Sequence, residues 1–246
     1  MADAGDRPDA VEPATKTHTV YDTLRRMILA GELAPDSVVS VLDLSRRFGV
    51  SRTPLRESLR LLERDGLIVY VGSHQHRSVR ISPLSMSDLD ELYALRVPLE
   101  ALALSLTAPA LRRSDLRTLR GEAELTARGD AEAHRRFHTM LRKGAGERIN
   151  HRLDELFDQA SRYQWAFMER EPDPEVVAER LAEHHGLVDA LAAGDLQRAR
   201  ELLVDHLAGT ALALMTAERH APFALPRAIA MAKARQDTVA GTSAAH

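Results

Sequence analysis

The stretch that decides the fold is residues 49–67, GVSRTPLRESLRLLERDGL. It predicts an amphipathic helix over residues 52–64, because apolar side chains recur at the three- and four-residue spacing of one helix face. The predicted buried stripe consists of Leu55, Leu59 and Leu62. The opposite, exposed face carries hydrogen-bond donors, namely Arg52, Thr53, Arg56 and Arg60. Such a face suits an anionic partner.

The flanking sequence places this helix in a larger module. A first helix is predicted over residues 21–31 and a short second helix over residues 41–48, closed by Gly49. Residues 67–81 read as two extended runs around a turn-forming stretch, which predicts a β-hairpin. Two short helices joined by a glycine turn and followed by a hairpin describe a winged helix-turn-helix over residues 19–82, with the third helix as recognition helix.

The predicted recognition helix carries side chains that can read B-DNA. Guanidinium groups can bind guanine O6 and N7 together, whereas hydroxyl groups and a helix N-terminus suit phosphate oxygens. Ser51 also stands at the N-cap position of the helix, and the hairpin tip can enter the adjacent minor groove. The predicted DNA-binding residues are Arg25, Ser51, Arg52, Thr53, Arg56, Arg60, His76 and Arg77. On an isolated helix such an arginine-rich face is more often simply solvated, but the surrounding module favours DNA.

Residues 49–67 resemble the signature of the GntR family of bacterial transcription regulators. The first helix agrees with the family as well, although Pro35 is followed by Asp36 where glycine is usual. The wing tip, residues 72–77, also departs from the family pattern. The resemblance implies a dimer that binds a pseudo-palindromic operator. Its main DNA contacts would be Arg52, Thr53 and Arg56.

Composition and charge limit what else the chain can be. The 246 residues include no cysteine, which excludes disulfides, thiol catalysis and cysteine-ligated zinc. No apolar run reaches the ~20 residues of a membrane span, and the N-terminus lacks the apolar region of a signal peptide, so a cytoplasmic protein without membrane partners is expected. Although the net charge of the whole chain is −3, residues 19–82 are basic, because they carry ten arginines against seven acidic residues.

Helical spacing dominates the rest of the chain. It predicts an all-helical bundle of about six helices over residues 83–218 and therefore a mainly α fold. In the first of these helices, residues 88–107, we expect one buried face made of Leu92, Leu95, Leu99, Leu102 and Leu106. The two ends, residues 1–18 and residues 219–246, are predicted to be a disordered arm and a weakly ordered tail.

Four histidines of the bundle stand out. His134 and His138 lie four residues apart on one helix face, a spacing that lets two imidazoles share one metal ion. His184 and His206 lie on two helices predicted to be antiparallel about a turn at residues 194–195, where they would face each other. Single histidines on helices are more often surface or satisfied core residues, and that alternative stays open.

The bundle resembles the all-helical FCD effector domain of the FadR subfamily, on segments that include Phe137-His138, Glu183-His184 and His206-Leu207. In metal-binding members, one aspartate and three histidines hold a divalent ion, and a small carboxylate effector completes its coordination. The resemblance maps the three histidines onto His138, His184 and His206, and His134 stands at the position of the aspartate. Four nitrogen ligands favour zinc or nickel over manganese or magnesium.

The resemblance also implies an effector site and a function. Arg96 matches the arginine that would bind the effector's carboxylate in a bidentate manner, and Glu100 is its i,i+4 partner. The chain is therefore predicted to be a ligand-responsive DNA-binding repressor, a homodimer and not an enzyme. The alternative is a metal-dependent hydrolase that uses the histidine cluster, which would need a general base beside the metal. A helical interaction module would leave residues 49–67 unexplained.

Overall fold

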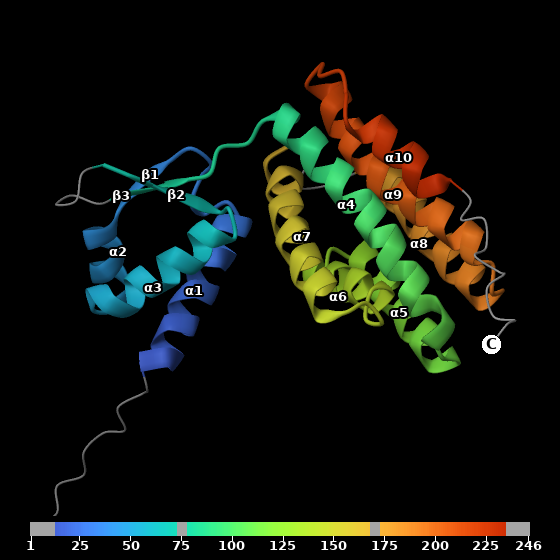
Figure 1. Ribbon diagram of the computed structural model, residues 1–246, viewed down its shortest axis with the longest axis horizontal. Helices are drawn as coiled ribbons and strands as arrows, with labels where there is room; N and C mark the ends of the chain where they lie inside the picture. The colour runs from blue at the N-terminus through green and yellow to red at the C-terminus, as the bar shows by residue number, and fades with distance from the viewer. Residues whose placement is uncertain (1–12, 73–77, 168–172, 235–246) are drawn as a thin grey trace, which may run out of the picture. The chain divides into compact units, whose positions relative to one another are not determined.

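The computed structural model describes residues 13–72, 78–167 and 173–234. The chain divides into two compact units, residues 1–84 and residues 85–246. Figure 1 shows strands in the first unit and a bundle of helices in the second. Within the described residues, no helix is long and apolar enough to cross a membrane. The predicted mainly α fold is confirmed.

The first unit is a winged helix-turn-helix. Its elements are α1 (Pro13–Leu29), β1 (Val38–Ser40), α2 (Val41–Phe48), α3 (Arg52–Arg64), β2 (Ile68–Val71) and β3 (Ser78–Ile81). The three strands form an antiparallel sheet in the order β1-β3-β2. The predicted stripe of α3 is buried in the core of this unit, where Leu55, Leu59 and Leu62 pack with apolar side chains of α1 and the sheet.

Local capping sets the tight turn between α2 and α3. The Ser40 hydroxyl accepts the N–H of Leu42 at 3.2 Å and so starts α2. Gly49 ends α2 with a φ of 60°, in the left-handed region that strains other residues. The N–H of Val50 then donates to the carbonyl oxygen of Ser45 at 3.2 Å. The chain therefore reverses within three residues and presents the N-terminus of α3.

The first helix begins earlier than predicted, at Pro13. Proline is favoured in the first turn of a helix, where its missing N–H would have had no partner. The Ser58 hydroxyl donates to the carbonyl oxygen of Thr17 at 2.7 Å, so α3 holds the early part of α1. The prediction of a disordered arm is therefore wrong for residues 13–18, and residues 1–12 lie outside the described ranges.

The described part of the second unit is helical throughout. Its elements are α4 (Met86–Thr107), the 3₁₀ turn η1 (Ala108–Ala110), α5 (Arg113–Ala127), α6 (Ala131–Leu141), α7 (Glu147–Phe167), α8 (Pro174–Ala192), α9 (Leu196–Ala217) and α10 (Leu225–Lys233). α4 packs against α7, α9 and α10, while α5 packs against α6 and α8. Figure 1 shows α4 running the length of this bundle. A helix so placed can contribute side chains to the interior along most of its length.

The structure buries a different side of α4 from the one predicted. Of the predicted stripe, Leu92 is buried, but Leu95, Leu102 and Leu106 are 56%, 41% and 48% exposed. Arg96 and Glu100 point inward instead, each only 2% exposed, because they form an ion pair at 2.9 Å. The prediction was wrong because α4 is apolar on several sides, and such a helix does not reveal which side faces the core.

The outward leucines of α4 form a continuous apolar line. Leu95, Leu99, Leu102 and Leu106 follow one another at intervals of four, three and four residues. This is the spacing of the a and d positions of a coiled coil, which place one side chain per turn along a helix–helix contact. We call these four residues the α4 seam.

The predicted C-terminal tail contains a docked helix, α10. Its Leu225, Ala228 and Ala232 are buried, and α10 packs against α4 and α9. The Asp90 carboxylate of α4 accepts the backbone N–H groups of residues 223, 224 and 225 at 2.9, 2.7 and 2.9 Å, which supplies donors at the start of α10 with their partner. The tail prediction is therefore wrong for this segment, because Asp90 lies far away in sequence.

Replacing Asp90 by asparagine is expected to lower the free energy of unfolding by about 2 kcal/mol at pH 7, the scale of a charge-assisted hydrogen bond. The side-chain amide keeps one acceptor oxygen but turns an NH₂ group toward backbone donors that Asp90 satisfies with both oxygens. Urea denaturation followed by circular dichroism measures the difference. An unchanged free energy of unfolding would contradict this role for Asp90.

The same difference should depend on pH. Burial raises the pKa of the Asp90 carboxyl, but the N–H donors of Ala224, Leu225 and Phe223, with a contribution from His220, outweigh burial and lower the pKa below its usual value. The contribution of Asp90 is therefore complete above the unfolded-state pKa of about 4 and is lost as the pH falls through the folded-state pKa. The gap between wild type and Asp90→Asn should narrow below about pH 4.

Candidate metal centre and DNA-binding surface

The N-terminal end of α3 presents an open basic face. Arg52, Thr53 and Arg56 are exposed, and within the described ranges no acidic side chain pairs with either arginine. Ser51 occupies the N-cap position, but its side chain makes none of the expected capping hydrogen bonds. Backbone N–H groups at this end, together with the Ser51 hydroxyl, are therefore available to donate hydrogen bonds to a phosphate oxygen of a partner.

The other predicted DNA contacts are less favourably placed. Arg60 is exposed, but its guanidinium pairs with Glu57 at 2.9 Å. Arg25 lies half-buried on α1. His76 and Arg77 of the wing tip fall outside the described residues. The structure thus assembles Ser51, Arg52, Thr53 and Arg56 at one helix end and leaves the contribution of the wing as a prediction.

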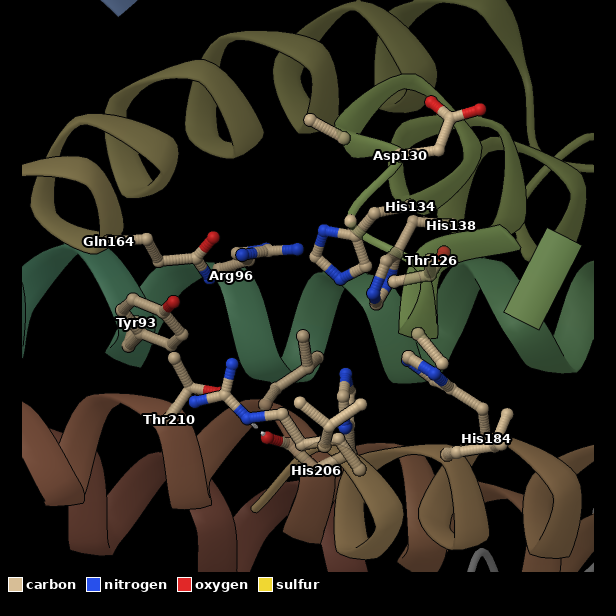
Figure 2. A pocket seen from close by; sticks show the side chains of 17 residues that line it. Tyr93, Arg96, Thr126, Asp130, His134, His138, Gln164, His184, His206 and Thr210 are labelled. Carbon is tan, nitrogen blue, oxygen red and sulfur yellow. Dashed lines mark hydrogen bonds between the residues drawn. The ribbon is translucent and has the colours of Figure 1, made fainter. Parts of the chain in front are cut away.

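The four predicted histidines come together inside the second unit. His134 and His138 lie on α6, His184 on α8 and His206 on α9. One ring nitrogen from each can be chosen such that all four lie within 4.8 Å of one another. Figure 2 shows the imidazoles converging on a common space. Each of His138, His184 and His206 is at most 8% exposed, so the cluster is an interior feature of the bundle.

Two carboxylates stand behind the cluster and orient two of its rings. Glu183 Oε2 lies 2.7 Å from Nδ1 of His206, and Glu100 Oε2 lies 3.4 Å from Nδ1 of His138. A carboxylate that accepts a hydrogen bond from Nδ1–H leaves Nε2 as the electron-pair donor. Nε2 of His138 and Nε2 of His184 are buried and have no hydrogen-bond partner. Such orphaned nitrogens fit a metal ion as the missing partner.

Burial also keeps the imidazoles in the form that binds metals. Desolvation lowers the pKa of His138 to about 4, although Glu100 opposes the shift, and lowers the pKa of His184 to about 2, with His206 and His138 adding to it. The pKa of His134 is lowered well below its usual value by burial first and then by the neighbouring imidazoles. These three rings are therefore neutral at pH 7, and no proton has to leave them for a metal to bind.

A cavity of about 230 Å³ opens beside the cluster. All four histidines line it, together with residues from α4, α7, α8 and α9, and Arg96 is among them. The Arg96 guanidinium lies 5.5 Å from the centre of the Tyr93 ring and 5.0 Å from that of Phe157. Its Nε is bonded to Glu100, whereas Nη2 is buried without a partner. Arg96 is thus held in place through Nε, while Nη2 stays free to donate to a ligand.

Glu100 has a different place from the one predicted. It does not line the cavity and contacts Arg96 and His138 from behind. Burial raises the pKa of Glu100, but the charge of Arg96 and the interaction with His138 outweigh burial, and the pKa falls to about 2. Glu100 is therefore an ionised positioning residue. It was predicted as an effector contact, but in the structure it lies behind Arg96 and not in the cavity wall.

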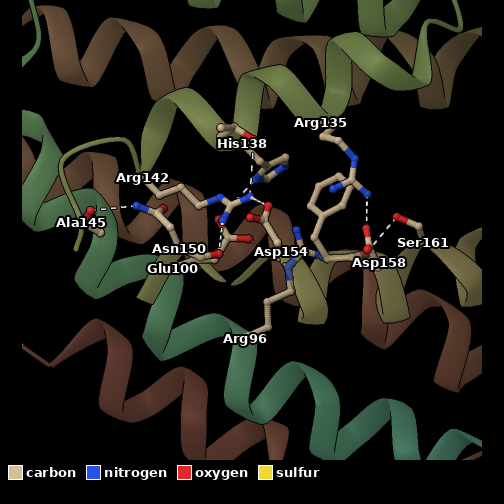
Figure 3. Close-up of polar contacts among 12 residues, drawn as sticks. Arg96, Glu100, Arg135, His138, Arg142, Ala145, Asn150, Asp154, Asp158 and Ser161 are labelled. Atoms are coloured by element: carbon tan, nitrogen blue, oxygen red, sulfur yellow. Dashed lines mark hydrogen bonds and ion pairs between the residues drawn. The ribbon is translucent and has the colours of Figure 1, made fainter. Parts of the chain in front are cut away.

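Ion pairs between α6 and α7 brace the side of the cluster away from the cavity. Arg142 donates to the carbonyl oxygen of Asn150 at 2.8 Å and pairs with Asp154, and Arg135 pairs with Asp158 (Figure 3). Arg135 directly follows His134 in the sequence. These contacts fix the rotation of α6 and with it the direction of both histidines on that helix.

Two carboxylates near the cluster have roles that the sequence did not predict. Asp130 lies four residues before His134, but its carboxylate accepts the N–H of Ala133 at 3.0 Å and caps α6. Glu183 directly precedes His184 and had no predicted role, yet it orients His206. A signal was available, because a carboxylate next to one histidine of the cluster lies within reach of another on the antiparallel helix. Tyr93, Gln164 and Thr210 of the cavity wall carried no comparable signal.

A winged helix-turn-helix followed by an all-helical unit defines a DNA-binding transcription regulator. The sequence model described as bacterial regulatory proteins, gntR family, matches residues 16–79, and the FCD domain matches residues 91–209. The chain therefore belongs to the GntR family of transcription regulators, and its FCD domain supports the FadR-like subfamily.

Individual relatives agree with this assignment. The uncharacterized regulator BphR of Paraburkholderia xenovorans is 31% identical over 204 residues, which span 76% of this chain and 80% of BphR. The transcriptional repressor GlaR of Escherichia coli is 27% identical over 202 residues, spanning 76% of this chain and 90% of GlaR. The solved structure of E. coli McbR/YncC matches the fold with a TM-score of 0.71 at 20% identity, covering 85% of this chain and 100% of McbR.

Proposed function

We propose that the protein is a transcriptional repressor whose FCD domain binds a divalent metal ion through His134, His138, His184 and His206. A small carboxylate effector would then bind in the adjoining cavity. The observation that carries this proposal is the convergence of four ring nitrogens within 4.8 Å on a cavity that also contains a fixed, unpaired guanidinium donor. The relative GlaR is named a transcriptional repressor, which supports repression over activation.

The chemistry of the ligand set points to zinc or nickel. Four imidazole nitrogens suit these borderline ions, whereas manganese and magnesium prefer oxygen ligands. A bound divalent ion would supply a Lewis-acidic position for a carboxylate oxygen. The protein side of the site orients the rings through Glu183 and Glu100 and places Nη2 of Arg96 to donate to the effector.

No specific observation favours a hydrolase. A metal-dependent hydrolase needs a general base beside its metal. Among the described residues, Asp130 is the one carboxylate that lines the cavity, and it is occupied in capping α6. Family and relatives are those of transcription regulators.

The DNA-binding function can be tested at Arg52, the first exposed guanidinium of α3. We expect Arg52→Ala to weaken binding to a DNA fragment from upstream of the gene by about 1–3 kcal/mol, the range for one bidentate contact with a guanine. Electrophoretic mobility shift against a random fragment measures the change. Unaltered sequence-selective binding would reject Arg52 as a base contact.

A matched control separates base contact from loss of charge. Arg113→Ala removes an arginine that is also exposed, from α5 in the other unit. It should leave the preference for the upstream fragment unchanged, because it lies outside the helix that reads the groove. Equal losses for both variants would indicate a general electrostatic effect.

We also propose that the protein is a homodimer that pairs through the α4 seam. A pseudo-palindromic operator requires two recognition helices related by a two-fold axis. The leucines of the α4 seam lie on the surface at coiled-coil spacing, which a second copy of α4 would cover. Effector binding in the same bundle would then change operator affinity with a coupling of about 1–3 kcal/mol. A mobility shift of the zinc-loaded protein with and without small carboxylic acids tests this response.

A further inference from the structure

The cavity has a second polar end that the metal proposal does not use. The Tyr93 hydroxyl is buried and lacks a hydrogen-bond partner, as does Nη2 of Arg96. In Figure 2, Tyr93, Gln164 and Thr210 lie together at the opposite end from His184, with Arg96 between. A buried hydroxyl and a buried guanidinium nitrogen without partners cost free energy unless a ligand supplies acceptors.

The balance of charges around the cavity favours a ligand with two negative charges. Two arginines line the cavity, Arg96 and Arg180. Glu100 offsets the charge of Arg96 at 2.9 Å, and Glu183 interacts electrostatically with Arg180 on the same helix. Asp130 pairs with an exposed arginine of α6. The protein's own charges therefore cancel, so the two positive charges of a divalent ion held by neutral imidazoles remain for the ligand to balance.

Part of the cavity wall is apolar. Val177 and Leu181 of α8 and Leu207 of α9 line the cavity. Such side chains favour methylene groups over hydroxyl groups in the middle of a ligand, because a hydroxyl would lose its hydrogen bonds to water without replacement. The cavity therefore combines two groups of anion-binding side chains with apolar side chains in its wall.

We infer that the effector is a small aliphatic dicarboxylate. One carboxylate faces the four histidines, and the second accepts hydrogen bonds from the Tyr93 hydroxyl and Nη2 of Arg96, next to Gln164. This inference rests on the proposed function, since the first carboxylate is the one assigned to the metal. It makes Tyr93 a specificity-determining residue.

The test compares acids that differ only in the second carboxylate. Isothermal titration of zinc-loaded, desalted full-length protein would use malonate, succinate and glutarate against propionate, butyrate and valerate. For at least one of the three pairs, the diacid is expected to bind on the order of tenfold tighter than the monoacid of the same length. Zinc content is measured again after titration, so that removal of zinc by a chelating diacid is not counted as binding.

The outcomes separate this inference from the proposed function. If monoacids bind as tightly as diacids at all three lengths, the dicarboxylate inference is overturned while the carboxylate effector stands. If neither kind of acid binds to the zinc-loaded protein, both are overturned.

A conservative variant locates the second carboxylate. Tyr93→Phe should weaken diacid binding on the order of tenfold and leave monoacid binding unchanged. Without acid it should be no less stable than wild type, because it removes a hydroxyl that has no partner. Tyr70→Phe removes the same group from the DNA-binding unit and should leave both affinities unchanged. Equal diacid affinity for Tyr93→Phe and wild type would overturn the assignment.

Discussion

Replacing His138 by alanine is expected to remove the metal ion from the protein. His138 is fully buried, its Nε2 has no protein partner, and Glu100 approaches its Nδ1. Loss of this ligand leaves three nitrogens around an interior space, so zinc affinity should fall by at least ~100-fold, more than the loss of an orienting neighbour costs. The measurement is elemental analysis after loading with zinc or nickel and desalting, with about one ion per chain for wild type.

A histidine outside the cluster provides the control. His151 of α7 has a side chain that is 60% exposed and lies 3.3 Å from Glu155. His151→Ala should bind as much metal as wild type. Circular dichroism of the metal-free proteins distinguishes loss of a ligand from loss of the fold. Equal metal content in His138→Ala and wild type would refute the metal centre, as would a wild-type protein that takes up neither ion.

The elements that sequence predicted well are those whose determinants are local. α2 ends at Gly49 because one glycine adopts the left-handed conformation, and the buried side of α3 follows from three leucines within eight residues. The two histidine pairs could be predicted for a similar reason, whereas the resemblance to the FCD domain implied that the pairs meet. Two of the histidines share one turn of α6, and the tight turn at Gly194 folds the helices of the other two against each other.

The elements that sequence missed depend on distant partners. α10 is docked through Asp90, more than 130 positions earlier in the chain, and β1 has only three residues, which pair with β3. The predicted buried face of α4 left out Arg96 and Glu100, because a charged pair on a helix is usually solvated. Their burial depends on each other and on His138, which approaches from α6. A pattern along one helix does not contain such a third partner.

The exposed leucines of α4, which sequence predicted to be buried, lead to another prediction. Leu102→Glu is expected to convert the proposed dimer into a monomer. Leu102 lies in the middle of the α4 seam and is 41% exposed in the single chain. In an isologous contact each leucine of the seam meets the partner's seam, so the substitution places two carboxylates in one apolar interface. Burying unpaired like charges costs several kcal/mol, which is comparable to what a short helix pair gains.

Sedimentation equilibrium of the wild type and the variant measures the association directly, and the variant should also lose cooperative binding to a two-half-site operator, since single half-sites bind far more weakly. Leu125→Glu is the matched control, because Leu125 is similarly exposed at 39% but lies on α5, outside the α4 seam. That control should remain dimeric. A dimeric Leu102→Glu protein would show that the contact lies elsewhere, whereas dissociation of Leu102→Glu alone would assign the exposed leucines of α4 to the partner copy.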